Sequence, residues 1–92
     1  MGLFSSDKPR VSTLEFKNKV RPALSAKGFT HKELEQLEGL LVGSLYEARD
    51  EEKGIDSGEV EQIVGWLRAN ASHHTFSPKQ IDEIEATLRK HL

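Results

Sequence analysis

The chain has 92 residues, a formal net charge of −2 at pH 7 and no cysteine. A chain of this length forms one domain, and folding buries only about 60 to 65 % of the surface of the unfolded chain. Without cysteine, disulfides and thiolate metal sites are excluded, and an intracellular protein is the simplest interpretation. No apolar run approaches the roughly 18 residues of a membrane span, and the N-terminus lacks a secretory signal, so we expect a cytoplasmic protein.

Residues 1–10 are expected to form a flexible tail, and residues 11–92 a single helical domain. The opening residues, with Gly2 after the initiator, fit the pattern of N-myristoylation. A single acyl chain gives only marginal membrane binding. We therefore expect no membrane association, and whether Gly2 is acylated stays open.

Four segments share a pattern that is typical of helix starts. In each, an apolar residue precedes a capping residue, Glu or Gln follows three residues after the cap, and a second apolar residue comes next. The cap oxygen accepts a hydrogen bond from a first-turn amide, Glu or Gln bonds back to the cap's own amide, and the apolar pair forms a hydrophobic staple. The segments are VSTLEF at 11–16, FTHKEL at 29–34, IDSGEV at 55–60 and FSPKQI at 76–81.

The helices that follow these starts have apolar residues at helical spacing. In chain order they are predicted to span about 13–27, 31–49, 57–70 and 78–91. Pro22 is expected to kink or split the first helix, and the second helix, with the widest apolar arc, is expected to be central. No alternating pattern indicates a strand. The sequence therefore predicts an all-α fold, either a compact four-helix bundle or two packed helical hairpins.

An acidic loop, DEEKGIDSGEV at 50–60, separates the second and third predicted helices. Residues 34–70 resemble a degenerate EF-hand, a helix-loop-helix whose twelve-residue loop binds calcium through side-chain oxygens and a bidentate Glu at its last position. The best frame places Ile55 at the apolar eighth position. The candidate cation ligands in this frame are Asp50, Glu52, Asp56 and Glu59.

This frame departs from the EF-hand pattern at two important positions. Ala48 stands first, where an oxygen ligand is needed, and Lys53 stands where glycine makes the sharp turn, one residue before Gly54. The half that matches best, Ile-Asp-x-x-Glu-Val, is also the helix-start pattern that the other three helices use without an acidic run. We interpret it first as a helix start, and a cation-responsive module remains the alternative.

Patterns for zinc binding and catalysis are weak. Adjacent His73 and His74 are expected to lie in a polar loop between the third and fourth helices rather than to converge on a metal ion. The chain has no nucleophile motif and no phosphate-binding glycine loop. Glu35 and Glu38, neighbours on the second predicted helix, are expected to form a solvated edge. We expect a protein that is not an enzyme and has no cofactor and no metal.

The charge is unevenly distributed, with +5 in residues 1–32 and −8 in residues 33–63. Such asymmetry indicates either a basic arm for an acidic partner or opposite charges that face each other within the fold. Lys17, Lys19 and Arg21 of the first predicted helix make nucleic-acid binding a second alternative. Against it, the acidic residues of the next helix would repel phosphate.

Protein binding is the leading functional hypothesis. Gly39 and Gly43, four residues apart on the second predicted helix, leave a strip without side chains where a helix can approach closely, and Tyr46 lies near this strip. Trp66 lies about 100° from the centre of the third helix's apolar stripe, where a tryptophan is half covered. Exposed, it would be the kind of anchor that interfaces use; covered by the N-terminal tail, it would belong to the core. Together with the acidic segment 47–61, these residues predict a surface for another protein; the oligomeric state and the partner stay open.

Overall fold

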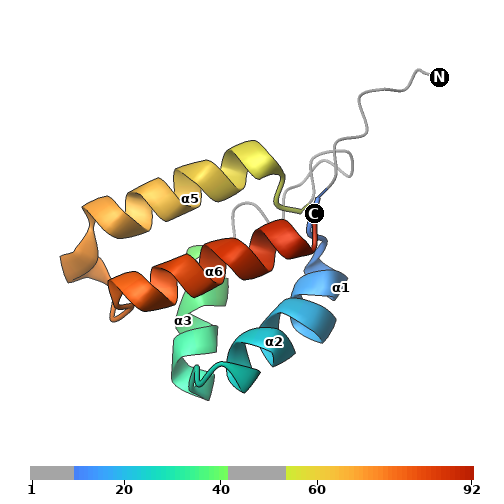
Figure 1. The fold of residues 1–92 in the computed structure, drawn as a ribbon, viewed down its shortest axis with the longest axis horizontal. Coiled ribbons are helices and arrows are strands. Elements are labelled where there is room, and N and C mark those ends of the chain that lie inside the picture. The colour runs from blue at the N-terminus through green and yellow to red at the C-terminus, as the bar shows by residue number, and fades with distance from the viewer. Residues whose placement is uncertain (1–9, 42–53) are drawn as a thin grey trace.

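The computed structural model describes residues 10–41 and 54–92, which fold into helices (Figure 1). No strand element occurs in these two ranges, so the predicted all-α fold is confirmed. The elements are α1 (Thr13–Glu15), the π-helical turn η1 (Phe16–Val20), α2 (Arg21–Ala26), α3 (His31–Leu40), α5 (Ser57–Ala69), the 3₁₀ turn η3 (Ala71–His73) and α6 (Pro78–Lys90). The part of the second predicted helix beyond Leu41, and the tail before Arg10, lie outside the described residues.

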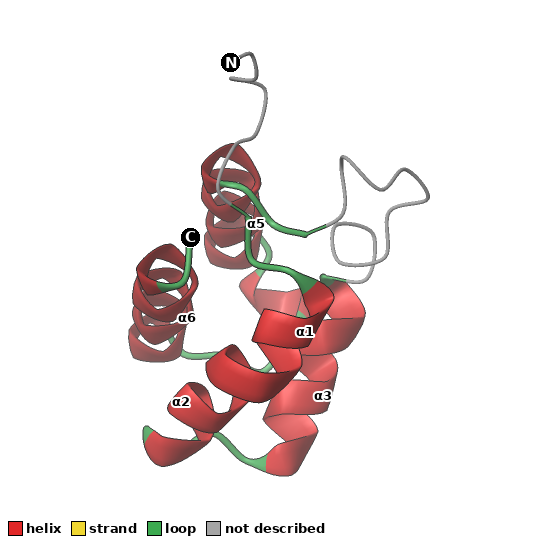
Figure 2. Ribbon diagram, turned by 90° about the vertical axis from the view of Figure 1, so that its right-hand side faces the viewer, coloured by secondary structure: helices red, strands yellow, loops and turns green. Residues whose placement is uncertain are grey.

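The described helices form two hairpins. Helices α5 and α6 lie side by side and run in opposite directions, joined through η3, and α2 and α3 form the other pair (Figures 1 and 2). The two hairpins meet where α2 contacts α6. This arrangement corresponds to the predicted packing of two helical hairpins.

All four predicted helix starts are capping boxes. At Ser12, Thr30, Asp56 and Ser77, the cap side chain accepts a hydrogen bond from the amide three residues later, and the side chain there accepts one from the cap's amide. Every staple residue is at most 5 % exposed, so each helix start is fixed to the core by its apolar pair. The pairs are Val11 with Phe16, Phe29 with Leu34, Ile55 with Val60, and Phe76 with Ile81.

The first predicted helix changes its hydrogen-bond pattern just before Pro22. The amide of Arg21 bonds to the carbonyl of Phe16, five residues earlier, so this turn is wider than an α-helical turn. Pro22 follows as the second residue of α2, which continues directly from this turn. The predicted kink or split at Pro22 is therefore a π-helical turn, a form that the sequence pattern did not specify.

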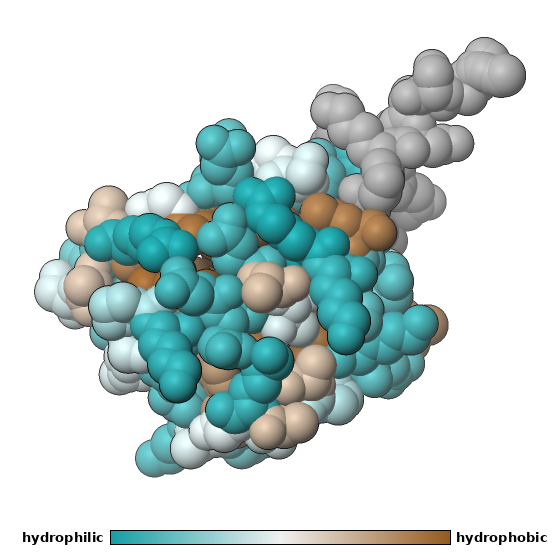
Figure 3. Space-filling view, viewed as in Figure 1, coloured by the Kyte–Doolittle hydropathy of each residue, from teal (hydrophilic) through white to brown (hydrophobic). Residues whose placement is uncertain are grey.

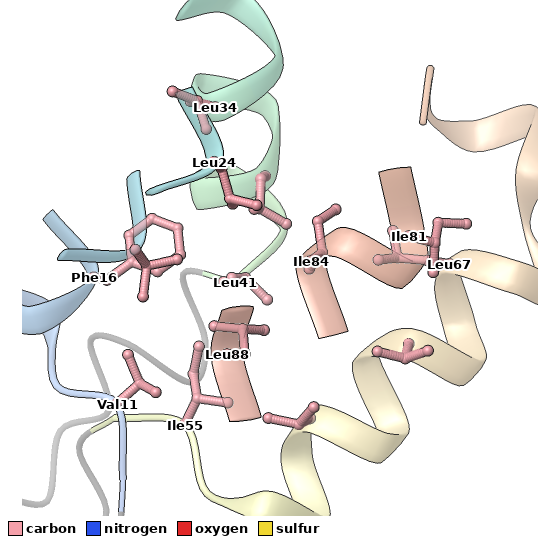
Figure 4. Close-up of a cluster of buried hydrophobic side chains, with 14 of the residues drawn as sticks. Val11, Phe16, Leu24, Leu34, Leu41, Ile55, Leu67, Ile81, Ile84 and Leu88 are labelled. Atoms are coloured by element: carbon pink, nitrogen blue, oxygen red, sulfur yellow. The ribbon is translucent and has the colours of Figure 1, made fainter. Parts of the chain in front are cut away.

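The core lies between the two hairpins. In Figure 4 the side chains of Leu41, Ile84 and Leu88 meet at the centre of a cluster that receives residues from every predicted apolar stripe. The outer face over α6 is mostly hydrophilic (Figure 3). Within the described ranges, no helix combines the length and apolarity that crossing a membrane requires.

An antiparallel β-bridge joins the segments that precede α1 and α5. The amide of Val11 donates to the carbonyl of Ile55 at 2.8 Å, and the amide of Ile55 donates to the carbonyl of Val11 at 2.9 Å. Gly54, with φ of 97°, passes so close that a Cβ there would lie 2.7 Å from the Val11 oxygen. Only glycine fits this position without strain, because both the positive φ and the close approach exclude a side chain.

Candidate interaction site

An apolar groove of about 240 Å³ lies where the end of α3 faces α5. The described residues that line it are Leu40, Ile63, Trp66 and Leu67. Leu40 and Trp66 are partly exposed, at 40 % and 42 % of their surface, whereas Leu67 is fully buried. None of these four side chains is ionisable, so the described lining offers apolar contact rather than acid–base chemistry.

The amphipathic patterns of the two helices explain why the groove is apolar. On α5, Leu67 faces the core, and Ile63 and Trp66 lie about 40° and 100° further around the helix at 100° per residue. Trp66 is therefore at the edge of the apolar stripe and half covered, as its position predicted. On α3, Leu37 is fully buried and Leu40 lies about 60° away, so Leu40 turns toward the groove.

The loop after η3 ties the two sides of the groove together through residues 74–76, which we call the strap. Thr75 forms a reciprocal pair with Gln36, one turn before Leu40 on α3: the Gln36 amide donates to the Thr75 hydroxyl at 2.8 Å, and the Thr75 amide donates to Gln36 Oε1 at 3.2 Å. His74 bonds the carbonyl of Leu67 on α5 at 2.6 Å. The strap thus connects both walls of the groove.

The predicted strip of small residues is described only at its first member. Gly39 is exposed, and no described atom lies within 4 Å of the place that a Cβ would occupy. It directly precedes Leu40 of the groove lining but is not itself among the described lining residues. Gly43 and Tyr46 lie outside the described residues.

Two of the four candidate cation ligands are described, and both take part in a capping box. Glu59 Oε1 accepts the amide of Asp56 at 3.2 Å, and Asp56 Oδ1 accepts the amide of Glu59 at 2.8 Å. The Arg10 guanidinium lies 3.9 Å from Asp56 and 4.0 Å from Glu59, so a cationic group of the chain already faces these carboxylates. Asp50 and Glu52 lie outside the described residues.

The two adjacent histidines have different environments. His73 is exposed, whereas His74 is only 9 % exposed and is bonded through both ring nitrogens. In the parts of the chain that the structure describes, no three His, Asp or Glu side chains gather closely enough to hold a metal ion. The expected polar loop therefore contains one buried residue, which connects α5 to the strap.

Opposite charges face each other at the contacts of α2 with its neighbours. Arg21 lies 2.6 Å from Glu38 and 3.4 Å from Glu35 of α3, and Lys27 lies 2.8 Å from Glu83 of α6. Two cations of the basic segment 1–32, Arg21 and Lys27, are therefore paired with acidic residues of the same chain. Lys17 and Lys19 of η1 are exposed.

Comparisons of the chain with protein-family models, with curated proteins and with solved structures found no match. The candidate site is therefore defined by its own geometry.

Of the groove-lining residues, sequence reasoning singled out Trp66 but not Leu40 or Ile63, and it did not connect His74 to them. A signal for Leu40 was present, because the apolar arc of the second predicted helix covers more than half its circumference, more than the stripe that a helix typically turns toward a core. No pattern marks His74, since its role depends on a carbonyl seven residues earlier.

Proposed function

We propose that this chain is a small non-enzymatic helical module that binds another protein, and that the groove between α3 and α5 receives an apolar anchor side chain of that partner. The observation that carries the proposal is the pairing of two large, partly exposed apolar side chains, Leu40 and Trp66, across one groove. Tryptophan is enriched among the residues that dominate interface energies, and anchors of this kind insert into well-packed apolar pockets.

The size and lining of the groove support a side-chain anchor rather than a small-molecule ligand. Pockets for small molecules typically enclose about 300 to 1,000 Å³ and place a few polar groups among apolar ones. This groove has about 240 Å³, and its described lining is mostly apolar. The open space at Gly39, the residue before Leu40, would leave room for the partner's backbone to approach. The proposal includes a cytoplasmic location, which the absence of cysteine supports.

The test is capture of a partner from the native host, followed by affinity measurements with the purified partner. Trp66→Ala and Leu40→Ala should each weaken binding by about tenfold or more, the loss of about 1.4 kcal/mol that an anchor contact typically provides. The matched control is Leu14→Ala, because Leu14 is also an exposed leucine, at 69 %, but lies on α1 away from the groove. Circular dichroism of each variant establishes that the fold is retained.

Two results would overturn this assignment. The first is a partner whose affinity is unchanged by Trp66→Ala and Leu40→Ala. The second is binding to duplex DNA that weakens steeply with salt and is lost in Lys17→Glu, which would move the function to the exposed cations of η1.

A further inference from the structure

The hydrogen bonds of His74 define one protonation state of its ring. Nε2 lies 2.6 Å from the carbonyl oxygen of Leu67, which can only accept, so Nε2 carries the hydrogen. Nδ1 accepts the backbone N–H of Phe76 at 3.1 Å, so Nδ1 carries a free electron pair. The structure therefore holds His74 as the neutral imidazole with its hydrogen on Nε2.

A second proton on His74 is incompatible with this arrangement. It can bind only at Nδ1, where its N–H would point at the N–H of Phe76, and that contact would change from a hydrogen bond to a repulsion. Phe76 is 5 % exposed, so its amide would lose its partner away from water. Either the ring or the strap must then move.

No acidic group beside His74 offsets such a charge within the described residues. The described partners of its ring are the Leu67 carbonyl, the Phe76 amide and the rings of Trp66 and Phe76, with ring centres 6.2 Å and 5.4 Å away. The charged or titratable groups of the surrounding elements are engaged elsewhere or exposed. Arg68 of α5 pairs with Asp82 and Glu85 of α6. Glu33 of α3 bonds Thr30 and Gln80. His73 of η3 is exposed.

The contacts of the strap carry a change at His74 to both walls of the groove. On the α5 side, His74 bonds the backbone of Leu67, a lining residue, and its ring packs beside Trp66, another lining residue. On the α3 side, Thr75 is paired with Gln36, one turn from Leu40. Residues 74 and 75 are adjacent, so a single peptide unit links the contacts with the two walls.

We propose that the strap makes the groove sensitive to acid: protonation of His74 releases the Phe76 amide, loosens the strap and changes the positions of Trp66 and Leu40. The change in the groove is a property of the isolated chain. Its consequence, weaker partner binding at acidic pH, rests on the function proposed above.

The test is an NMR titration of the full chain without any partner, from about pH 8 to about pH 5, the range in which histidine side chains change charge. The signals followed are the ring protons of His74, the indole N–H of Trp66 and the side-chain amide of Gln36. We expect the Trp66 and Gln36 signals to shift with the same midpoint as the His74 ring. The shift should persist in His73→Gln, the control for the other histidine beside Trp66, which lies 6.3 Å from the indole. It should disappear in His74→Gln, whose amide retains a donor for the Leu67 carbonyl.

Three results would overturn the inference: Trp66 and Gln36 signals that stay constant while His74 titrates, signals that follow His73 instead, or a His74 ring that remains neutral down to about pH 5. If His74→Gln does not fold, the comparison of midpoints within wild type and His73→Gln still decides. A partner that is insensitive to Trp66→Ala would overturn the proposed function alone, because the titration uses no partner.

Discussion

The two flanks of α3 differ in how far neighbouring helices cover them. Toward α2, Glu35 and Glu38 pair with Arg21, and Leu37 packs into the core below them. Toward α5, the described residues form a groove with Leu40 on its rim, and the strap makes a polar connection to α3 through Gln36. Helix α3 thus has one flank that is closed by contacts with α2, and an open flank toward α5, on which Leu40 is partly exposed.

The difference shows how an excess of apolar surface becomes available for binding. The apolar arc of the second predicted helix covers more than half of its circumference, which is wider than the stripe that a helix typically turns toward a core. On α3 the uncovered part is Leu40, opposite the uncovered edge of α5 at Trp66. The same sequence feature that builds the core therefore also supplies the groove.

The largest expected effect is a loss of stability, and it distinguishes two leucines on the same helix. Leu37→Ala should lower the free energy of unfolding by about 2 to 5 kcal/mol, because Leu37 is fully buried and its truncation leaves a cavity. Leu40→Ala should cost about 1 kcal/mol, since Leu40 is already 40 % exposed. Urea denaturation of both variants measures the difference. Equal losses would mean that Leu40 is as covered as Leu37, and that α3 has no open flank toward α5.

Two glycines give the next comparison. Gly54→Ala should destabilise the fold by about 1 to 3 kcal/mol, because a Cβ would meet the Val11 oxygen and the positive φ disfavours alanine. Gly39→Ala should instead stabilise it by about 0.5 to 1 kcal/mol, because alanine is the better helix former and the space at Gly39 is open. Thermal denaturation followed by circular dichroism distinguishes the two signs. A loss of stability in Gly39→Ala would show that this flank of α3 is occupied in the folded chain.

The sequence predicted local features of the fold far better than the site. The capping boxes at Ser12, Thr30, Asp56 and Ser77 are set by residues three apart, so each could be predicted from six consecutive residues, and all four are confirmed. The half-covered position of Trp66 followed from the period of one helix.

The features that were missed depend on which elements become neighbours. The π-helical turn at Phe16–Val20 adapts the helix to Pro22, which a pattern of apolar spacing does not encode. The groove requires α3 and α5 to face each other, and the strap requires Gln36 to meet Thr75, 39 residues later. Such pairings are decided by the packing of the hairpins, and a single sequence gives no direct measure of it.

The smallest expected effect concerns Glu33, which connects the first turn of α3 to α6, two turns before Leu40. The backbone N–H of Thr30 donates to Glu33 Oε1 at 2.9 Å and Gln80 donates to Oε2 at 2.8 Å, and these bonds lower the pKa of Glu33 below its usual value. Because the pKa is lower in the folded state, the ionised carboxylate stabilises the fold above about pH 4.3, the ordinary pKa of glutamate, and this contribution is lost as the pH falls through the lowered pKa.

Glu33→Gln should therefore lose less stability than wild type on acidification, by a few tenths of a kcal/mol, because Glu33 is only partly buried and solvent screens its interactions. Glutamine at this position retains the capping box, as Gln80 does at the start of α6, so the variant removes the titration without removing the cap. Urea denaturation at intervals from about pH 6 to about pH 3 measures the effect. The matched control is Glu61→Gln, an exposed carboxylate on α5, which should follow wild type. Parallel curves for Glu33→Gln and wild type would show that the bonds from Thr30 and Gln80 do not favour the ionised form, and that the contact of α3 with α6 depends on apolar packing instead.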